Sequence, residues 1–251
     1  AGLISIALDP DFTRNRFIYL GLSTDMETNV IRRYRFVPDA YDEIAQSAVE
    51  IIAVQGAQAR RSWHNVGSIG FTEEGYLWAL FGDKVRQEKA QDLASPLGAL
   101  LRIIPDGGPD GGYSIPEDNP YADGEGHPAV YAKGLRSPWK GFYIDGQWFF
   151  GDIGLDSYEE VNQIALPGDN FGWPDHEGPC APECGMSIGP WVSYGRSSRH
   201  PFVRADPQAT SARWRSVWVG LSYRPLEGVP DPYRRRWTDV LVFGDTFSGF
   251  V

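Results

Sequence analysis

The stretch Gly75-Tyr-Leu-Trp-Ala-Leu-Phe-Gly-Asp83 ends in a tripeptide that recurs twice further along the chain. Phe-Gly-Asp stands at 81–83, 150–152 and 243–245, and each copy closes a short run of aromatic and β-branched residues. Such a run is typical of a strand, and a glycine before a carboxylate is typical of its end. A recurring unit of this kind indicates a repeat architecture. Successive copies are 69 and 93 residues apart, which suits four-stranded propeller blades with long loops.

Short strands and tight turns continue on both sides of this stretch. The chain holds 29 Gly, 19 Pro and 14% aromatic residues, a composition that favours many short strands over long helices. We therefore predict an all-β fold, a β-propeller of four-stranded blades, with no helix longer than two turns. The predicted strands span 2–8, 16–22, 29–36, 48–54, 67–71, 76–81, 97–104, 130–135, 140–144, 147–150, 159–166, 217–223 and 240–243.

The chain is predicted to be a single propeller domain, residues 1–251, with about four blades, because no shift in composition marks a second domain. Four blades would leave open sheet edges, which proteins normally avoid. We therefore expect the propeller to be incomplete, truncated at both ends or with its other blades supplied elsewhere. The N-terminal segment 1–10 lacks an initiator Met and a basic region, so it is not expected to be a signal peptide.

Charge, hydropathy and cysteine content limit the partners and the compartment. A net charge of −10 argues against nucleic acid, which needs a basic surface, and no apolar run is long enough for a transmembrane helix. Cys180 and Cys184 alone cannot form a four-ligand zinc site. A local disulfide would imply a periplasmic or secreted protein. Two buried free thiols are the alternative.

Of the four histidines, His64 is the candidate for a catalytic role. His127 and His200 precede prolines and His176 follows a Trp-Pro-Asp turn, so all three suit loops. His64 precedes the strand that leads to Asp83, and neighbouring strands of one blade can bring these two residues together. A histidine held by a carboxylate can act as a general base. The alternative is a turn histidine beside an aspartate that only caps a strand.

Two further segments carry candidate ligand groups. Arg136, on a loop between strands, can bind a carboxylate or a developing oxyanion through its planar guanidinium group. A salt bridge between blades is the alternative. The segment 152–162 supplies carboxylates and loop carbonyls, the hard oxygen ligands that calcium takes, although it does not match an EF-hand loop. An ordinary acidic surface loop is the alternative here.

A series of motifs runs in order through most of the chain. They are Gly2-Leu-Ile-Ser-Ile-Ala-Leu-Asp-Pro-Asp-Phe12, His64-Asn65, Gly82-Asp83, Leu97-Gly-Ala-Leu-Leu-Arg-Ile103, Ser114-Ile-Pro-Glu-Asp-Asn-Pro-Tyr121, Gly134-Leu-Arg-Ser-Pro-Trp139, Gly151-Asp-Ile-Gly154, Glu159-Glu-Val-Asn162, Asp169-Asn-Phe-Gly-Trp-Pro174 and Glu177-Gly178. Together they resemble the soluble PQQ-dependent sugar dehydrogenase family. Its members, glucose/sorbosone and aldose sugar dehydrogenases among them, are six-bladed β-propellers that use pyrroloquinoline quinone (PQQ).

The resemblance implies catalytic roles for three residues. His64 would take the proton of a sugar or alcohol hydroxyl while a hydride passes to PQQ, and Asp83 would orient His64. Arg136 would stabilise negative charge on the reduced cofactor. The implied partners are therefore a small-molecule sugar or alcohol and an electron acceptor.

The resemblance also implies ligands for PQQ and for calcium. Ser137, Gly154 and Leu155 would bind PQQ together with Arg136. The carbonyls of Gly154 and Leu155 would hold the calcium ion that polarises the quinone, and Glu160 would support a neighbouring calcium site.

The chain departs from the family pattern at several positions. Ser137 stands where the family commonly has Asn, Val66 replaces the first of two glycines, and Lys84 begins a segment that is usually polar and Gln-rich. Two hypotheses follow: an active quinoprotein sugar or alcohol dehydrogenase, or a propeller without catalysis that serves as an extracytoplasmic binding or assembly subunit with protein partners. No two carboxylates stand at a separation that would indicate a glycosidase.

Overall fold

The first Phe-Gly-Asp stretch lies in a four-stranded antiparallel sheet whose strands pair in chain order. The computed structural model describes residues 2–56, 63–106, 111–180, 184–196, 215–225, 228–233 and 239–247. In this part of the chain, the same simple meander forms three sheets, and a two-stranded sheet follows them. The strands are β1 (Gly2–Leu8), β2 (Phe17–Ser23), β3 (Thr28–Arg35) and β4 (Val49–Gln55); β5 (Val66–Phe71), β6 (Leu77–Phe81), β7 (Ala99–Ile103) and β8 (Val130–Lys133); β9 (Pro138–Ile144), β10 (Gln147–Asp152), β11 (Tyr158–Ile164) and β12 (Val192–Gly195); and β13 (Val217–Tyr223) with β14 (Val240–Asp245).

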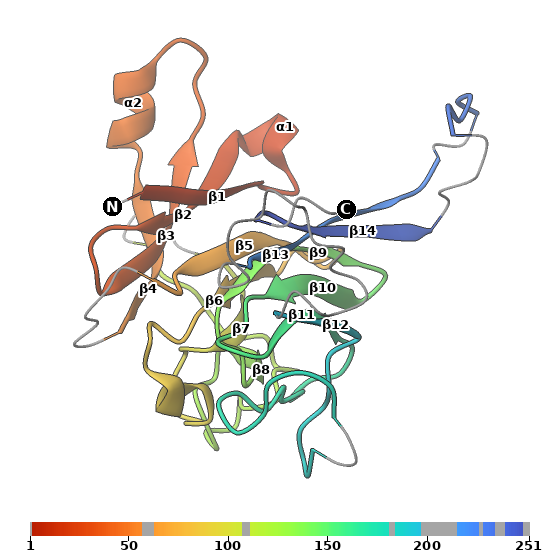
Figure 1. The fold of residues 1–251 in the computed structure, drawn as a ribbon. Helices are drawn as coiled ribbons and strands as arrows, with labels where there is room; N and C mark the ends of the chain where they lie inside the picture. The colour runs from red at the N-terminus through yellow and green to blue at the C-terminus, as the bar shows by residue number, and fades with distance from the viewer. Residues whose placement is uncertain are drawn as a thin grey trace.

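The first strands of successive sheets pack against each other. β1 lies against β5, β5 against β9, and β9 against β13, so the sheets follow one another around these strands, as Figure 1 shows. The loops that join the strands then meet at the ends of neighbouring sheets. This arrangement brings residues that are far apart in the sequence to a common site.

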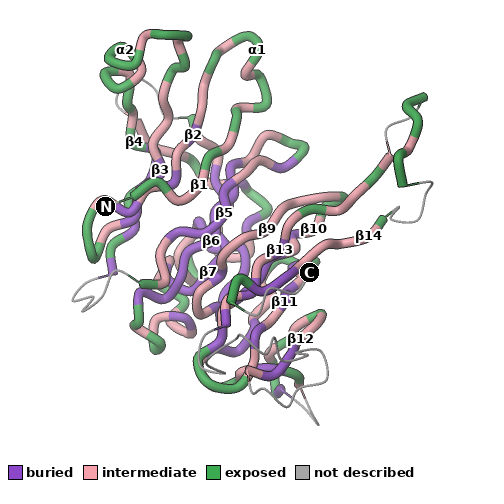
Figure 2. Tube along the Cα trace, turned by 45° about the horizontal axis from the view of Figure 1, so that its top comes forward, coloured by how far each residue is buried: buried purple, intermediate pink, exposed green. Residues whose placement is uncertain are grey.

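The hydrophobic core lies between the sheets rather than within one of them. One cluster joins the first and second sheets through Ile31 and Phe81. Another joins the second and third sheets through Leu100 and Phe150. Val217 belongs to a further cluster, between the third sheet and β13–β14. All residues of β6 and β7 are buried, because neighbouring sheets cover both faces of these strands (Figure 2). Their almost unbroken apolar sequences reflect this burial on two sides.

The predicted all-β fold of four-stranded units is confirmed, and each predicted strand exists within a few residues of its expected bounds. The sequence did not reveal β12, a four-residue strand in a turn-rich segment that is defined only by its pairing with β11. It also did not reveal the short helices α1 (Phe12–Asn15), α2 (Tyr41–Gln46) and η1 (Gln87–Ala90), all of which are shorter than two turns.

Four predictions from the sequence remain: the absence of a transmembrane helix, the cysteine pairing, the place of His200 and the single domain. Among the described residues, no helix has the length and apolar character that crossing a membrane requires. Cys180 and Cys184 form a disulfide, with their Cα atoms 5.2 Å apart, so the interpretation as a disulfide is confirmed and the alternative of two free thiols is wrong. His200 lies outside the described residues. The single-domain organisation with about four blades stays a prediction.

Candidate active site

The structure brings the imidazole of His64 into contact with the carboxylate of Asp83. Nδ1 of His64 lies 2.5 Å from Oδ1 of Asp83, and the Asp83 side chain is fully buried. A carboxylate accepts hydrogen bonds, so in the neutral imidazole Nδ1 carries the hydrogen and Nε2 keeps its lone pair. The pair therefore presents one basic ring nitrogen in a fixed orientation.

The local backbone explains why His64 is held so closely. The Gly82 backbone lies against His64, and a side chain at position 82 would collide with the His64 carbonyl group. His64 itself has a φ of 49°, in the left-handed region that non-glycine residues rarely adopt. The residues that follow His64 and Asp83 also contact each other. The buried Lys84 ammonium donates to Oδ1 of Asn65 at 2.7 Å. Burial lowers the pKa of Lys84.

Trp173 connects Asp83 to Arg136. Its indole Nε1 donates to Oδ2 of Asp83 at 2.8 Å, and the guanidinium carbon of Arg136 lies 5.4 Å from the centroid of the indole ring. The backbone N–H of Asp83 also donates to the carbonyl of Arg136 at 2.9 Å. Trp173 in turn is fixed at its carbonyl, which accepts from Gln91 at 2.7 Å. The loops that carry His64 and Arg136 are therefore linked through Trp173 and Asp83.

Arg136 and Ser137 are held by the second Phe-Gly-Asp aspartate. The backbone N–H groups of Arg136 and Ser137 donate to the two carboxylate oxygens of Asp152 at 2.9 and 2.6 Å. Burial raises the pKa of Asp152 to about 7, although these two bonds favour its charged form. The Arg136 side chain is largely buried, and this burial lowers its pKa against the effect of nearby carboxylates, Asp83 first. Arg136 is thus a partly buried cation whose position is fixed through its backbone N–H.

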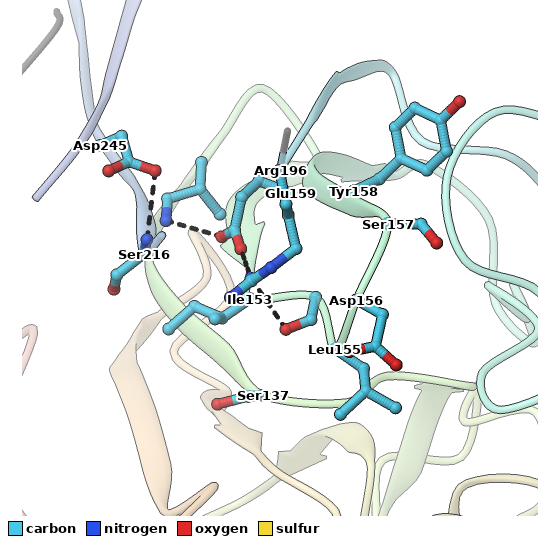
Figure 3. Close-up of polar contacts among 12 residues, drawn as sticks. Ser137, Ile153, Leu155, Asp156, Ser157, Tyr158, Glu159, Arg196, Ser216 and Asp245 are labelled. Atoms are coloured by element: carbon cyan, nitrogen blue, oxygen red, sulfur yellow. Dashed lines mark hydrogen bonds and ion pairs between the residues drawn. The ribbon is translucent and has the colours of Figure 1, made fainter. Parts of the chain in front are cut away.

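The loop between β10 and β11 carries the residues predicted to hold calcium. Its Gly154 carbonyl accepts hydrogen bonds from Nη1 of Arg136 at 2.8 Å and from Nη1 of Arg196 at 2.9 Å. Figure 3 shows Arg196 between this loop and Glu159. Leu155 is bound through its backbone N–H, which donates to Oε1 of Glu177 at 2.7 Å. The Gly154 carbonyl oxygen therefore already accepts from two arginine side chains.

Glu160 does not join a cluster of metal ligands. Its Oε1 accepts from the N–H of Gly178 at 2.6 Å, and its Oε2 accepts from the amide of Asn162 at 3.2 Å. Burial raises the pKa of Glu160 to about 8. In the part of the chain that the structure describes, no group of three or more His, Cys, Asp and Glu side chains could hold a metal ion. The Gly154 carbonyl and the Glu160 carboxylate, which already accept these hydrogen bonds, do not fit calcium in this arrangement, whereas the role of the Leu155 carbonyl stays a prediction.

Two arginines carry donors that suit an anionic ligand. Nε of Arg136 is buried and has no hydrogen-bond partner among the described residues, and the same is true of Nε and Nη1 of Arg215. A buried cationic donor without an acceptor is costly, and a carboxylate ligand would satisfy it. The Nε of Arg136, next to the β10–β11 loop, is therefore suited to a carboxylate ligand.

Sequence reasoning missed three residues of this region. Trp173 was noted only as part of a motif, Arg196 lies just after the unpredicted strand β12, and Arg215 precedes β13. Arg136 was a candidate from the sequence because it lies on a loop between strands, and its role stays a prediction. A tryptophan that donates to an aspartate 90 residues away leaves no local signal in the sequence.

Known proteins resemble this chain over most of its length. Residues 1–206 match the family described as Glucose / Sorbosone dehydrogenase. Quinoprotein glucose dehydrogenase B of Acinetobacter calcoaceticus is 28% identical over 207 residues, which cover 70% of this chain and 40% of that protein. The HIPL1 protein of Arabidopsis thaliana is 37% identical over 134 residues, or 46% of this chain and 19% of that protein.

A solved structure shares the fold. The PQQ-bound form of aldose sugar dehydrogenase from Streptomyces coelicolor superimposes with a TM-score of 0.66 at 23% identity, over 99% of this chain and 67% of that one. The chain spans less than half of the two curated relatives above. Because the family match covers most of the chain, the predicted resemblance is confirmed: this chain belongs to the Glucose / Sorbosone dehydrogenase family.

Proposed function

We propose that the protein is a quinone-dependent dehydrogenase of sugars or other small alcohols, with His64 as its general base. One observation carries the proposal: a chain of contacts runs from His64 through Asp83 and Trp173 to Arg136. The names of the relatives, glucose and aldose sugar dehydrogenases, support the substrate class. PQQ, when bound, would supply the acceptor for the hydride of the substrate carbon.

In the proposed reaction the residues of this chain handle the proton and the charge. Nε2 of His64 takes the hydroxyl proton of the substrate, and the Asp83 carboxylate stabilises the imidazolium that forms. Arg136 supplies a partly buried positive charge, which favours negative charge that develops near it. Trp173 contacts both Asp83 and Arg136 and holds them in fixed positions relative to each other.

We also propose that the protein works in an oxidising compartment, either the periplasm or the outside of the cell. The Cys180–Cys184 disulfide supports this location, because reducing compartments keep thiols free. Mapping free thiols in protein taken directly from its native compartment would test it. Reactive Cys180 and Cys184 in that material would contradict the proposal.

The function is tested by binding and turnover in the same preparation. PQQ binding is measured by quenching of tryptophan fluorescence, and turnover by reduction of an artificial electron acceptor with a panel of aldoses and alcohols. We expect PQQ to bind and at least one aldose to be oxidised. The exposed Arg224, which pairs with Asp145 and Asp239 on the surface, offers R224Q as a control with unchanged activity. A folded protein that neither binds PQQ nor turns over would overturn the proposal and favour a binding or assembly role.

A further inference from the structure

Arg196 lies at the position where the family resemblance implies a calcium ion. It follows β12 directly, and its backbone N–H donates to the carbonyl of Ser157 at 2.9 Å, which continues the pairing of β12 with β11. Its side chain is only 11% exposed and points toward the β10–β11 loop (Figure 3). The guanidinium group thus reaches the Gly154 carbonyl from the residue that directly follows β12 and is still paired with the β11 side.

Glu159 holds the Arg196 guanidinium in place. The two side chains form an ion pair, and the Glu159 side chain is fully buried. The second carboxylate oxygen of Glu159 accepts from the backbone N–H of Val217 at 2.9 Å. A buried ion pair needs such additional hydrogen bonds to offset the loss of water. Arg196 is therefore a built part of this site.

A calcium ion at the Gly154 carbonyl would lie close to two positive charges. Calcium binds oxygen at roughly 2.3–2.6 Å and needs six to eight such ligands. The nitrogens of Arg136 and Arg196 lie 2.8 and 2.9 Å from the same oxygen, so an ion bound there would be within about 5 Å of both. Like charges at that distance repel strongly in a buried site.

We propose that Arg196, paired with Glu159, replaces calcium at the Gly154 carbonyl, so that this loop binds the carboxylates or oxyanion of its ligand without calcium. Arg136 and Arg196 together supply the positive charge that a divalent ion would otherwise bring to the loop. A guanidinium group suits this task because it is always charged and donates several hydrogen bonds in a plane. The identity of the ligand as PQQ rests on the proposed function, whereas the exclusion of calcium does not.

The experiment compares PQQ affinity in EDTA and in millimolar calcium, by tryptophan fluorescence, for the wild type, R196Q, R196K and the surface control R224Q. The wild type and R224Q should bind PQQ equally well in both buffers. R196Q should bind about tenfold more weakly in EDTA, because a charge-assisted hydrogen bond is lost, and calcium should restore part of this affinity. R196K keeps a positive charge and should lose less. A wild-type affinity that falls about tenfold or more in EDTA overturns the proposal.

Thermal unfolding separates this proposal from the proposed function. If the protein binds no PQQ in either buffer, the proposed function fails, and the response of the unfolding midpoint to calcium still decides the role of Arg196. Calcium should then raise the midpoint of R196Q and leave that of the wild type unchanged. An equal rise in both proteins would contradict the replacement of calcium by Arg196. Circular dichroism of each variant shows whether it is folded. If R196Q does not fold, the same comparison with the wild type is made with R196K.

Discussion

The ends of β6 and β14 carry the same tripeptide, and their aspartates are held in almost the same way. Asp83 accepts from the N–H two residues later and from the Trp173 indole. Asp245 accepts from the N–H of Phe247 and from the Tyr194 hydroxyl. Both side chains are buried. Each aspartate also binds the loop that precedes the first strand of its own sheet.

The two regions differ in the group that this loop supplies. At Asp83 the donor is the imidazole of His64, whereas at Asp245 it is the backbone N–H of Ser216, as Figure 3 shows. The same buried aspartate ends a strand in both sheets. It is part of a candidate catalytic pair only where a titratable side chain, and not a backbone N–H, donates to it. The comparison teaches that the histidine, not the aspartate, separates a chemical site from a structural one.

The largest effect is expected where the Asp83 region is made to resemble the Asp245 region. H64N removes the base, and asparagine tolerates the left-handed backbone of residue 64 better than most residues. We expect kcat/KM for aldose oxidation to fall by about 10²–10⁴-fold, the usual contribution of a general base. Unfolding in urea should change little. A variant that keeps most of its activity would remove the distinction between the two regions.

The opposite result is expected for D245N. The amide that replaces one oxygen would face N–H and O–H donors, and a buried unsatisfied group costs about 1–3 kcal/mol. The free energy of unfolding in urea should fall by this amount, while kcat/KM per folded molecule stays the same. D239N, at an exposed carboxylate that pairs with Arg224, is the matched control and should cost about 0–1 kcal/mol. A loss of activity in folded D245N would show that both regions serve catalysis.

The aromatic donors allow a finer comparison of the two aspartates. W173F keeps an aromatic ring near Arg136 but loses the N–H that donates to Asp83, whereas Y194F loses the hydroxyl that donates to Asp245. We expect W173F to lower kcat about tenfold with a shifted pH profile of kcat, because one hydrogen bond to a charged group is worth about 1.5–3 kcal/mol. Y194F should lower stability alone. Equal kcat and pH profiles in the two variants would deny Trp173 a positioning role.

The sequence predicted those parts of the site that depend on strand ends. His64, Asp83 and Arg136 lie near the ends of β5, β6 and β8, strands that are mostly or fully buried and have strong apolar patterns. Trp173 and Arg196 could not be predicted in the same way. Trp173 acts across 90 residues, and Arg196 depends on β12, which exists only through its pairing with β11. The local sequence pattern predicts strands, but it does not predict which residues of different sheets contact each other.

The residue after each aspartate gives the last and smallest test of the comparison. Lys84 follows Asp83 and is fully buried, whereas Thr246 follows Asp245. Burial lowers the pKa of Lys84 below its ordinary value of 10.5, so the unfolded chain holds this proton more tightly than the native one. The free energy of unfolding therefore rises with pH between the lowered native pKa and 10.5, and it loses this gain as the pH falls.

K84M removes this titration while keeping a long side chain. Urea unfolding of both proteins over a series of alkaline pH values should show the wild type gaining stability relative to K84M as the pH approaches that of free lysine. The gain cannot exceed about 1.4 kcal/mol per pH unit, because one proton is involved. A constant difference between the two proteins would mean that the Lys84 ammonium is not penalised by burial. Its bond to Asn65 would then fully replace water, and the Asp83 loop would carry no electrostatic cost that the Asp245 loop lacks.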